Sequence, residues 1–336
     1  METSVGRPRV LVTDPLHPLA HDRLAAWADV ACLPEGLGRS ESDDALREAV
    51  AHADGLVVRR QLPVDVFEPP CTLRAVMRQG VGLDFIPVEH ATARGIPVGN
   101  TPAVNANAVA EYVFAALLAH SRQLADFDAR VRAGDWVARA QAGARTFELR
   151  GRTLGVIGFG AVGQRIGAIA QDGFGMRLAV CANTPSRVPP GIETMTLAAL
   201  FEASDFIVVA CPLTPRTRGM VDRSLLARTR PGAVLVNVGR GPVVREGDLA
   251  DALAAGELAG AVLDVFETQP PPANSPLRSH PGVLLTPHLA GLTQEAERAM
   301  GLLAVDTLGA LLRGERPPNI VNPEVFSPRN AQEPPP

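Results

Sequence analysis

The sequence predicts an α/β protein made of more than one α/β unit, and three observations carry this prediction. Short apolar runs alternate with helical stretches over most of the 336 residues, a rhythm that favours parallel strands joined by crossover helices. The spacing G-x-G-x-x-G directly follows the apolar run 153–157, where a strand would turn tightly into a helix. A chain of this length is also long enough for two domains.

The composition favours a small-molecule partner. With 46% hydrophobic residues and a net charge of −4, the chain is globular in character, without a basic face for nucleic acid or a polybasic cluster for lipid. The first ten residues contain no apolar signal core, and the apolar stretch 108–119 is too short to span a bilayer. The four scattered cysteines argue against a metal site or a disulfide framework and favour a reducing compartment. We therefore expect a cytoplasmic protein.

The first hundred residues are expected to form one α/β unit without a phosphate-binding motif. Its predicted strands are Arg9–Thr13, Val30–Leu33, Gly55–Val58, Leu73–Met77 and Val98–Gly99. Its predicted helices are Leu19–Ala28 and Asp43–His52. The polar segment 100–107 is interpreted as the crossing between domains, and a long helix is expected from Ala108 to Leu124. The stretch from Gly134 to Arg152 is polar and irregular.

The second half is expected to form a doubly wound sheet. Its six predicted strands are Thr153–Ile157, Arg177–Ala182, Phe206–Ala210, Ala233–Asn237, Gly260–Asp264 and Val283–Thr286. Its predicted helices are the one after the glycine turn, then Thr196–Ala203, Ser224–Arg228 and Gly247–Ala255. Ligands of such sheets lie beyond the carboxyl ends of the strands. The chain should then close with a helix over Glu295–Leu312 and a disordered tail at 327–336.

The glycine turn is the first indication of a ligand. Its glycines, Gly158, Gly160 and Gly163, permit a tight turn, close approach of a pyrophosphate and close packing of helix on strand. Val162 and Ile166 follow at helical spacing, which is the setting that the motif requires. A glycine-rich turn that serves packing alone is the alternative, and dinucleotide binding is the favoured interpretation.

Three polar residues stand where later strands end. Arg240 lies between two glycines, which should give its backbone freedom, and its planar fork matches a carboxylate. His288 follows the last strand, where general acid–base chemistry at neutral pH would need an imidazole. Asp264 closes the strand before it and could accept a carboxamide N–H. The alternatives are a surface arginine, a structural histidine and a capping aspartate.

Several motifs in a fixed order resemble the D-isomer-specific 2-hydroxyacid dehydrogenases. They are GFGAVG, CPLTPRTRGMV, NVGRGPVV, LDVFETQP and TPHLAG, together with RQGVGLDFIPVEHATARGIPVGNTPAVNANAVAEY and NIVNP. The resemblance covers most of the chain. It implies two doubly wound domains: a Rossmann-type NAD(P)-binding domain over 99–289 and a flavodoxin-like substrate domain from both chain ends, 1–98 and 290–330. It also implies a homodimer with the long helix after Asn107 at the interface.

The resemblance implies an oxidoreductase that transfers a hydride between NAD(P) and a small 2-hydroxy or 2-oxo acid. Arg240 would bind the carboxylate, His288 would be the acid–base group, and the backbone of Val81 and Gly82 would meet the substrate. The expected cofactor-binding residues are Gly158, Phe159, Gly160, Ala161, Val162, Gly163, Asn183, Thr184, Arg187, Cys211, Pro212, Val238, Asp264 and His288.

The sequence departs from the family pattern at Gln269, where a glutamate normally accompanies the histidine. A carboxylate beside an imidazole raises the pKa of the ring above its usual value of about 6.5, whereas glutamine orients the ring without supplying charge. Reduction should then weaken at higher pH, unless Glu267 replaces the missing carboxylate. Formate oxidation needs no such proton transfer, and the formate dehydrogenases also place glutamine here, so a formate-type enzyme is an alternative.

A second departure concerns the cofactor. The strand 177–182 leads into Asn183 and Thr184 without the acidic residue that holds the ribose of NAD. Thr184, Ser186 and Arg187 could instead donate to a 2′-phosphate. Either NAD or NADP is expected, and NADP is favoured.

Two further interpretations remain open. Arg59 and Arg60 follow a strand of the first unit and could hold a larger or more acidic substrate, or be a solvated pair. The family also resembles the C-terminal-binding corepressors, which suggests a nucleotide-sensing binding protein. The presence of Arg240 and His288 and the short tail make that role less favoured than an enzyme.

Overall fold

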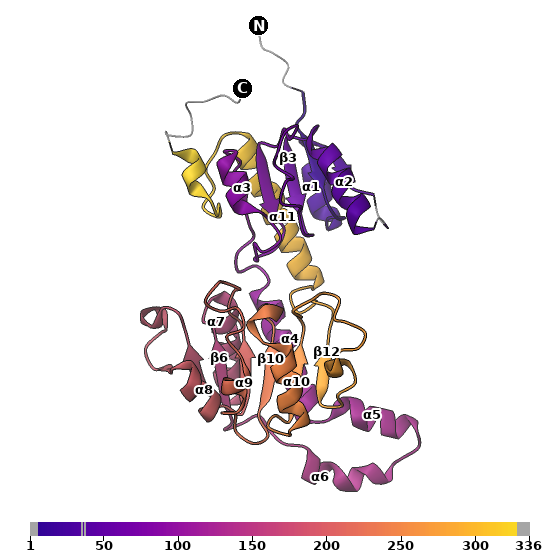
Figure 1. Ribbon diagram of the computed structural model, residues 1–336, viewed down its shortest axis with the longest axis vertical. Coiled ribbons are helices and arrows are strands. Elements are labelled where there is room, and N and C mark those ends of the chain that lie inside the picture. Colours follow the sequence, from indigo (N-terminus) through magenta and orange to yellow (C-terminus); the bar gives the residue numbers. More distant parts are fainter. Residues whose placement is uncertain (1–5, 35, 37, 328–336) are drawn as a thin grey trace. The chain divides into compact units, whose positions relative to one another are not determined.

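The computed structural model describes residues 6–34, 36 and 38–327. The chain divides into two compact units, which we describe separately (Figure 1). Unit 1 comprises Met1–Asn105 and Thr293–Pro336, and unit 2 comprises Ala106–Leu292. Apart from Ser327, the tail expected to be disordered lies outside the described residues.

Unit 1 contains a five-stranded parallel sheet in the order β2-β1-β3-β4-β5. This is the flavodoxin-like order, in which the chain switches direction between the first and third strands. The strands are β1 (Arg9–Val12), β2 (Asp29–Cys32), β3 (Gly55–Val58), β4 (Ala75–Arg78) and β5 (Val98–Gly99). The helices are α1 (Pro18–Ala25), α2 (Arg39–Val50), α3 (Val88–Ala93) and α11 (Gln294–Leu312), followed by the 3₁₀ turn η6 (Pro323–Phe326).

The two chain ends build unit 1 together. One face of the sheet packs against α1 and α11, so that Val57 and Met77 share a buried cluster with Leu308. The other face packs against α2, with Leu46 beside Leu56. Alternate side chains of a strand point to opposite faces, and both faces are apolar because both are covered.

Unit 2 contains a seven-stranded parallel sheet in the order β12-β11-β10-β9-β6-β7-β8. Read from β6, this is the doubly wound dinucleotide-binding order with one additional strand. The strands are β6 (Thr153–Ile157), β7 (Arg177–Cys181), β8 (Glu193–Thr194), β9 (Phe206–Val209), β10 (Val234–Asn237), β11 (Gly260–Leu263) and β12 (Val283–Leu285). The prediction of two doubly wound α/β domains is confirmed. The expected count of six strands was wrong, because β8 is two exposed polar residues long.

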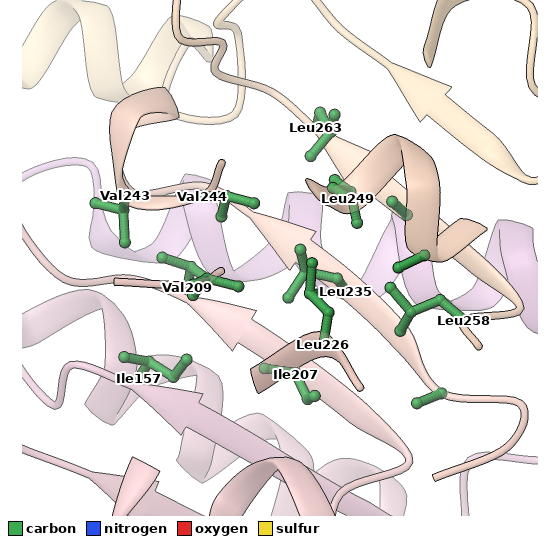
Figure 2. Close-up of a cluster of buried hydrophobic side chains, with 14 of the residues drawn as sticks. Ile157, Ile207, Val209, Leu226, Leu235, Val243, Val244, Leu249, Leu258 and Leu263 are labelled. Atoms are coloured by element: carbon green, nitrogen blue, oxygen red, sulfur yellow. The ribbon is translucent and has the colours of Figure 1, made fainter. Parts of the chain in front are cut away.

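Unit 2 contains seven α-helices in the described part of the chain. They are α4 (Ala106–Ser121), α5 (Leu124–Arg132), α6 (Ala142–Arg145), α7 (Ala161–Ala168), α8 (Leu197–Ala203), α9 (Arg223–Leu226) and α10 (Glu246–Ala254). Of these, α4, α7, α8, α9 and α10 pack against its sheet. Short irregular turns are η1 (Val137–Gln141), η2 (Ile169–Gly173), η3 (Pro185–Arg187), η4 (Gly241–Val243) and η5 (Pro276–Arg278). On β10, Val234 and Val236 face the layer of α4 and α7, whereas Leu235 faces α8, α9 and α10. Figure 2 shows this second layer, in which Leu235 lies among Ile207, Leu226 and Leu249.

The long helix predicted at 108–124 ends earlier than expected. Gln123 adopts a left-handed backbone (φ 54°), so α4 stops at Ser121 and α5 begins at Leu124. The segment from α5 to η1 also exposes large apolar side chains, including Trp136 at 71% and Val137 at 79%. No helix within the described ranges is long and apolar enough to cross a membrane.

Candidate functional site

The three glycines of the turn between β6 and α7 have different constraints. Gly158 has φ +94°, and a Cβ there would come within 2.8 Å of backbone atoms of Cys211. A Cβ on Gly163 would lie 2.2 Å from the carbonyl oxygen of Gly158. A Cβ on Gly160 would meet nothing within 4 Å. The outer two glycines are therefore required by the fold, whereas the middle one is not.

The open space at Gly160 fits a phosphate group. Gly160 is the N-cap of α7, and its backbone (φ −77°, ψ −164°) is accessible to any residue. The first N–H groups of a helix have no acceptor within the helix, and the helix dipole favours negative charge there. Glycine at this position keeps side-chain atoms away from those N–H groups. The turn thus fits the pyrophosphate of NAD or NADP.

A matched pair of substitutions separates these roles. Gly160→Ala should lower the free energy of unfolding by less than about 1 kcal/mol, the cost of alanine at an N-cap, and weaken cofactor binding about tenfold, which corresponds to about 1.4 kcal/mol. Gly163→Ala should destabilise unit 2 by about 1–3 kcal/mol, because its methyl group overlaps a backbone oxygen. Chemical denaturation and fluorescence titration with NADPH measure the two effects. Unchanged NADPH affinity in Gly160→Ala would contradict a pyrophosphate at this turn.

The end of β7 lies beside the glycine turn, because the N–H of Gly158 donates to the carbonyl of Cys181 at 2.8 Å. The next residues, Asn183, Thr184 and Arg187, are exposed. The segment 182–188 contains no acidic side chain, so the guanidinium of Arg187 is its only charge. This edge therefore offers hydrogen-bond donors and positive charge to a ligand.

Cys211 and Pro212 follow β9, on the other side of the turn. Burial raises the pKa of the Cys211 thiol to about 11, so the thiol is neutral at physiological pH and packs against the glycine turn. Val238 follows β10 and donates its N–H to Val209 at 3.1 Å. These residues line the carboxyl edge without presenting an ionised group.

Arg240 lies three residues after β10 in extended backbone, with φ −138° and ψ 140°. Asn237, buried at the end of β10, shapes the loop: its Oδ1 accepts from Gly239 N and its Nδ2 donates to Arg240 O, both at 3.1 Å. Gly239 O in turn accepts from Arg240 Nη1 at 2.8 Å. A Cβ on Gly241 would come within 1.9 Å of the Phe266 carbonyl group. That glycine is therefore needed for the close approach of two loops, and not for backbone freedom at Arg240.

Asp264 anchors the loop that carries His288. It is 1% exposed, and its Oδ1 accepts from Thr286 Oγ1 at 2.6 Å and from Leu289 N at 2.8 Å. Its Oδ2 accepts from Ala290 N at 2.9 Å. His288 itself has φ +58°, which is rare for a residue with a side chain. The carboxylate thus fixes the backbone around His288, and about one of its roughly four acceptor positions remains for a ligand.

The side chain of Gln269 contacts His288, with Oε1 at 3.2 Å from Nδ1. A carbonyl oxygen only accepts, so this contact assigns a proton to Nδ1. Glu267 is engaged elsewhere, because its Oε1 accepts from Glu246 N at 2.8 Å and its N–H donates to the Glu246 carboxylate. Glu267 therefore stabilises the start of α10 and does not replace the glutamate missing at position 269.

These contacts bring the loops after β10, β11 and β12 together at one edge of the sheet. The Arg240 loop packs on the segment at Phe266. The same segment continues to Gln269, whose side chain contacts His288 on the loop after β12. Because carboxyl ends of parallel strands share an edge, the glycine turn after β6 lies along it too. The described part of the chain contains no group of three or more His, Cys, Asp or Glu that could hold a metal ion.

Val81, Gly82 and Arg59 belong to unit 1. The carbonyl of Val81 accepts from Asn100 Nδ2 at 2.9 Å, and that of Gly82 accepts from Arg78 Nε at 3.2 Å. These bonds hold the loop in place, and contact of its N–H groups with a substrate stays a prediction.

The arginine pair of unit 1 is charge-compensated. Arg59 makes two 2.8 Å hydrogen bonds to Glu297 of α11. Arg60 donates a hydrogen bond to Asp14. Burial alone would raise the pKa of the Asp14 carboxyl, but the hydrogen bonds from Arg60 and Thr13 lower this pKa below its usual value. Substrate binding by Arg59 would have to compete with Glu297.

No sequence pattern predicts a role for Tyr112 and Thr286, whose hydroxyl oxygens lie 2.6 Å apart. Tyr112 is on α4 and Thr286 follows β12, so 174 positions separate them. The one available signal was composition, since Tyr112 is the single tyrosine of the chain.

The glycine turn at the carboxyl edge of a doubly wound sheet defines an NAD(P)-binding domain. Residues 114–290 match the family described as D-isomer specific 2-hydroxyacid dehydrogenase, NAD binding domain. The chain belongs to the D-isomer-specific 2-hydroxyacid dehydrogenase family.

Individual relatives agree with this assignment. A glyoxylate reductase of Pyrococcus furiosus is 41% identical over 84% of this chain and 86% of its own length. A D-3-phosphoglycerate dehydrogenase of Mycobacterium leprae is 40% identical over 94% of this chain, which spans only 59% of that longer relative. The structure of an NADPH-dependent glyoxylate/hydroxypyruvate reductase of Sinorhizobium meliloti, in complex with NADP and malonate, is 34% identical with a TM-score of 0.81. It covers 96% of this chain and 98% of its own.

Proposed function

We propose that the chain reduces glyoxylate, or a similarly small 2-oxo acid, to the 2-hydroxy acid with NADPH or NADH. One observation carries the proposal. The segment from Phe266 to Gln269 contacts both the Arg240 loop and His288, and all three belong to the sheet that bears the glycine turn. The names of the Pyrococcus furiosus and Sinorhizobium meliloti relatives support glyoxylate as the first substrate to test. In this proposal unit 2 binds the cofactor.

Each of the three side chains has a separate task in this reaction. The guanidinium of Arg240 holds the substrate carboxylate by charge-assisted hydrogen bonds and polarises the carbonyl to be reduced. Nε2 of His288 donates a proton to the oxygen that becomes the alcohol. Gln269 accepts from Nδ1 and so fixes the ring orientation. When bound, the reduced nicotinamide supplies the hydride.

The direct test is cofactor oxidation in the presence of glyoxylate, pyruvate, hydroxypyruvate and longer 2-oxo acids. The proposal expects turnover with the small acids, and it fails if none is reduced although the cofactor binds tightly. That second result would favour a nucleotide-sensing protein. Arg240 and His288, both held in ordered loops, favour the enzyme.

We favour NADPH over NADH because of the residues after β7. Arg187 supplies positive charge and Asn183 and Thr184 supply neutral polar groups where an acidic side chain would repel a 2′-phosphate. A lower KM for NADPH than for NADH is the expected result. A strong preference for NADH would overturn this part of the proposal.

Replacing Gln269 by glutamate should extend reduction to higher pH. A carboxylate beside Nδ1 favours the imidazolium and raises the pKa of His288. Since reduction uses the protonated ring, its rate falls as pH rises through that pKa, and a higher pKa moves this fall upward by about one pH unit. The pH profile of kcat/KM measures the shift. Glu267→Gln is the control, because Glu267 bonds the start of α10 and its loss should leave the profile in place.

The same glutamine supports a second candidate, a formate-type dehydrogenase. Oxidation of formate releases no hydroxyl proton, so it has no need for a carboxylate at position 269. Formate-dependent reduction of NAD or NADP, without reduction of any 2-oxo acid, would select this candidate.

We propose that the chain acts as a homodimer in the cytoplasm. Leu124, Val131, Trp136 and Val137 expose 53–79% of their surface on one stretch from α5 to η1, and large exposed apolar residues of this kind suit a protein interface. This segment is a better interface than α4, most of whose apolar residues are buried within unit 2. Sedimentation velocity tests the proposal, and a monomer at all concentrations would contradict it.

A further inference from the structure

A chain of hydroxyl groups runs from α4 to the loop of His288. Tyr112 Oη and Thr286 Oγ1 lie 2.6 Å apart, and Thr286 Oγ1 lies 2.6 Å from Asp264 Oδ1. The contact between the two hydroxyls alone does not reveal its donor. The carboxylate settles it, because an ionised carboxylate only accepts and a threonine hydroxyl has one proton to donate. Thr286 therefore donates to Asp264 and accepts from Tyr112.

This row of hydrogen bonds ends at the backbone on either side of His288. Asp264 accepts the N–H groups of Leu289 and Ala290, and His288 N donates to Thr286 O at 3.0 Å. His288 thus sits between two segments, both tied to the Asp264–Thr286 pair. Its left-handed backbone (φ +58°) persists only where the surroundings hold it in place.

We propose that Tyr112 and Thr286 are positioning residues that hold the His288 imidazole in its reactive orientation through Asp264. This inference rests on the proposed role of His288 as proton donor. Each hydroxyl acts by restricting the Asp264 carboxylate, which in turn fixes the two N–H groups after the histidine. Hydrogen bonds in such a row polarise one another, so the loss of one weakens the next.

The environment of Tyr112 agrees with a hydroxyl that stays protonated. Burial, with the charge of Asp264 adding to it, raises the pKa of the Tyr112 hydroxyl, although the bond to Thr286 opposes this shift. The phenol therefore remains a donor at neutral pH and well above it. Tyr112 can orient the carboxylate without adding an ionisation of its own to the pH profile.

The test uses the full chain with NADPH and glyoxylate. Tyr112→Phe and Thr286→Val should each lower kcat by about 2- to 10-fold, the effect of one net hydrogen bond, and leave the NADPH dissociation constant unchanged. Thr286→Ser keeps the hydroxyl and should restore the wild-type kcat. Ser204→Ala is the matched control, because it removes a buried 2.6 Å hydroxyl bond to Leu200 O elsewhere in unit 2. Its stability should fall while its kcat stays.

A second readout needs neither cofactor nor substrate. The His288 Cε1–H resonance can be identified by its absence from the spectrum of His288→Gln. It should move in Tyr112→Phe and Thr286→Val and stay in Ser204→Ala. If His288→Gln abolishes reduction while both variants keep the wild-type kcat and resonance, the positioning role is wrong and the proposed function stands. If His288→Gln is fully active, His288 is not the proton donor and the positioning role is wrong with it, whereas the proposed function itself fails only if the wild-type chain reduces no 2-oxo acid.

Discussion

Replacement of Arg240 by methionine is expected to lower kcat/KM for glyoxylate by about 10²–10³-fold, the usual effect of removing a group that stabilises developing charge on the reacting oxygen. Methionine keeps much of the length of the side chain but removes both the charge and the planar fork. The fold should survive, because the loop is shaped by the amide of Asn237 and by the close approach of Gly241 to Phe266. Steady-state kinetics and chemical denaturation together distinguish lost activity from lost structure.

Arg240→Lys refines this test. Lysine restores the charge but cannot form two parallel hydrogen bonds with a carboxylate, so it should recover only part of the activity. Arg278→Met is the control, since Arg278 is an exposed arginine of the same unit on η5, and its kinetics should match the wild type. Activity of Arg240→Met within a few-fold of wild type would rule out Arg240 as the carboxylate anchor.

The strands were predictable because they are buried on both faces. Phe206–Val209 and Gly260–Leu263 are continuous apolar runs with every residue buried, and such runs indicate parallel strands between two helical layers. The apolar pattern does not predict the strands and helices that are exposed or only partly buried. β8 consists of exposed Glu193 and Thr194, and α3 is a six-residue helix with one buried side chain, Ala91.

The candidate site was predictable where its residues stand at strand ends. Arg240, Asp264 and His288 each follow a recognisable strand, and parallel strands place such positions along one edge. The partners of these residues were not predictable. Tyr112 meets Thr286 across 174 positions, and Glu267 turns to Glu246 although its sequence position suggested His288. Contacts of this kind depend on how loops and helices pack, which no local pattern records.

The second large effect concerns His288. His288→Gln should lower kcat for reduction by about 10²–10⁴-fold, the contribution typical of a positioned general acid. Glutamine can still donate a hydrogen bond to the substrate oxygen, but it cannot transfer a proton at neutral pH. The decline in rate that accompanies deprotonation of the imidazole should then disappear from the pH profile. NADPH binding should weaken far less than kcat falls, because the glycine turn is unchanged.

His280→Gln provides the control for this variant. His280 precedes the same strand, β12, at its opposite end, and its Nδ1 accepts from Gly282 N at 3.1 Å. Its replacement should alter stability slightly and leave kcat and the pH profile as they are. A His288→Gln enzyme that keeps both the wild-type rate and the decline at high pH would show that the proton comes from another group. Arg240 could then still anchor the acid, but Gln269, Asp264, Thr286 and Tyr112 would be holding a histidine that takes no part in the reaction.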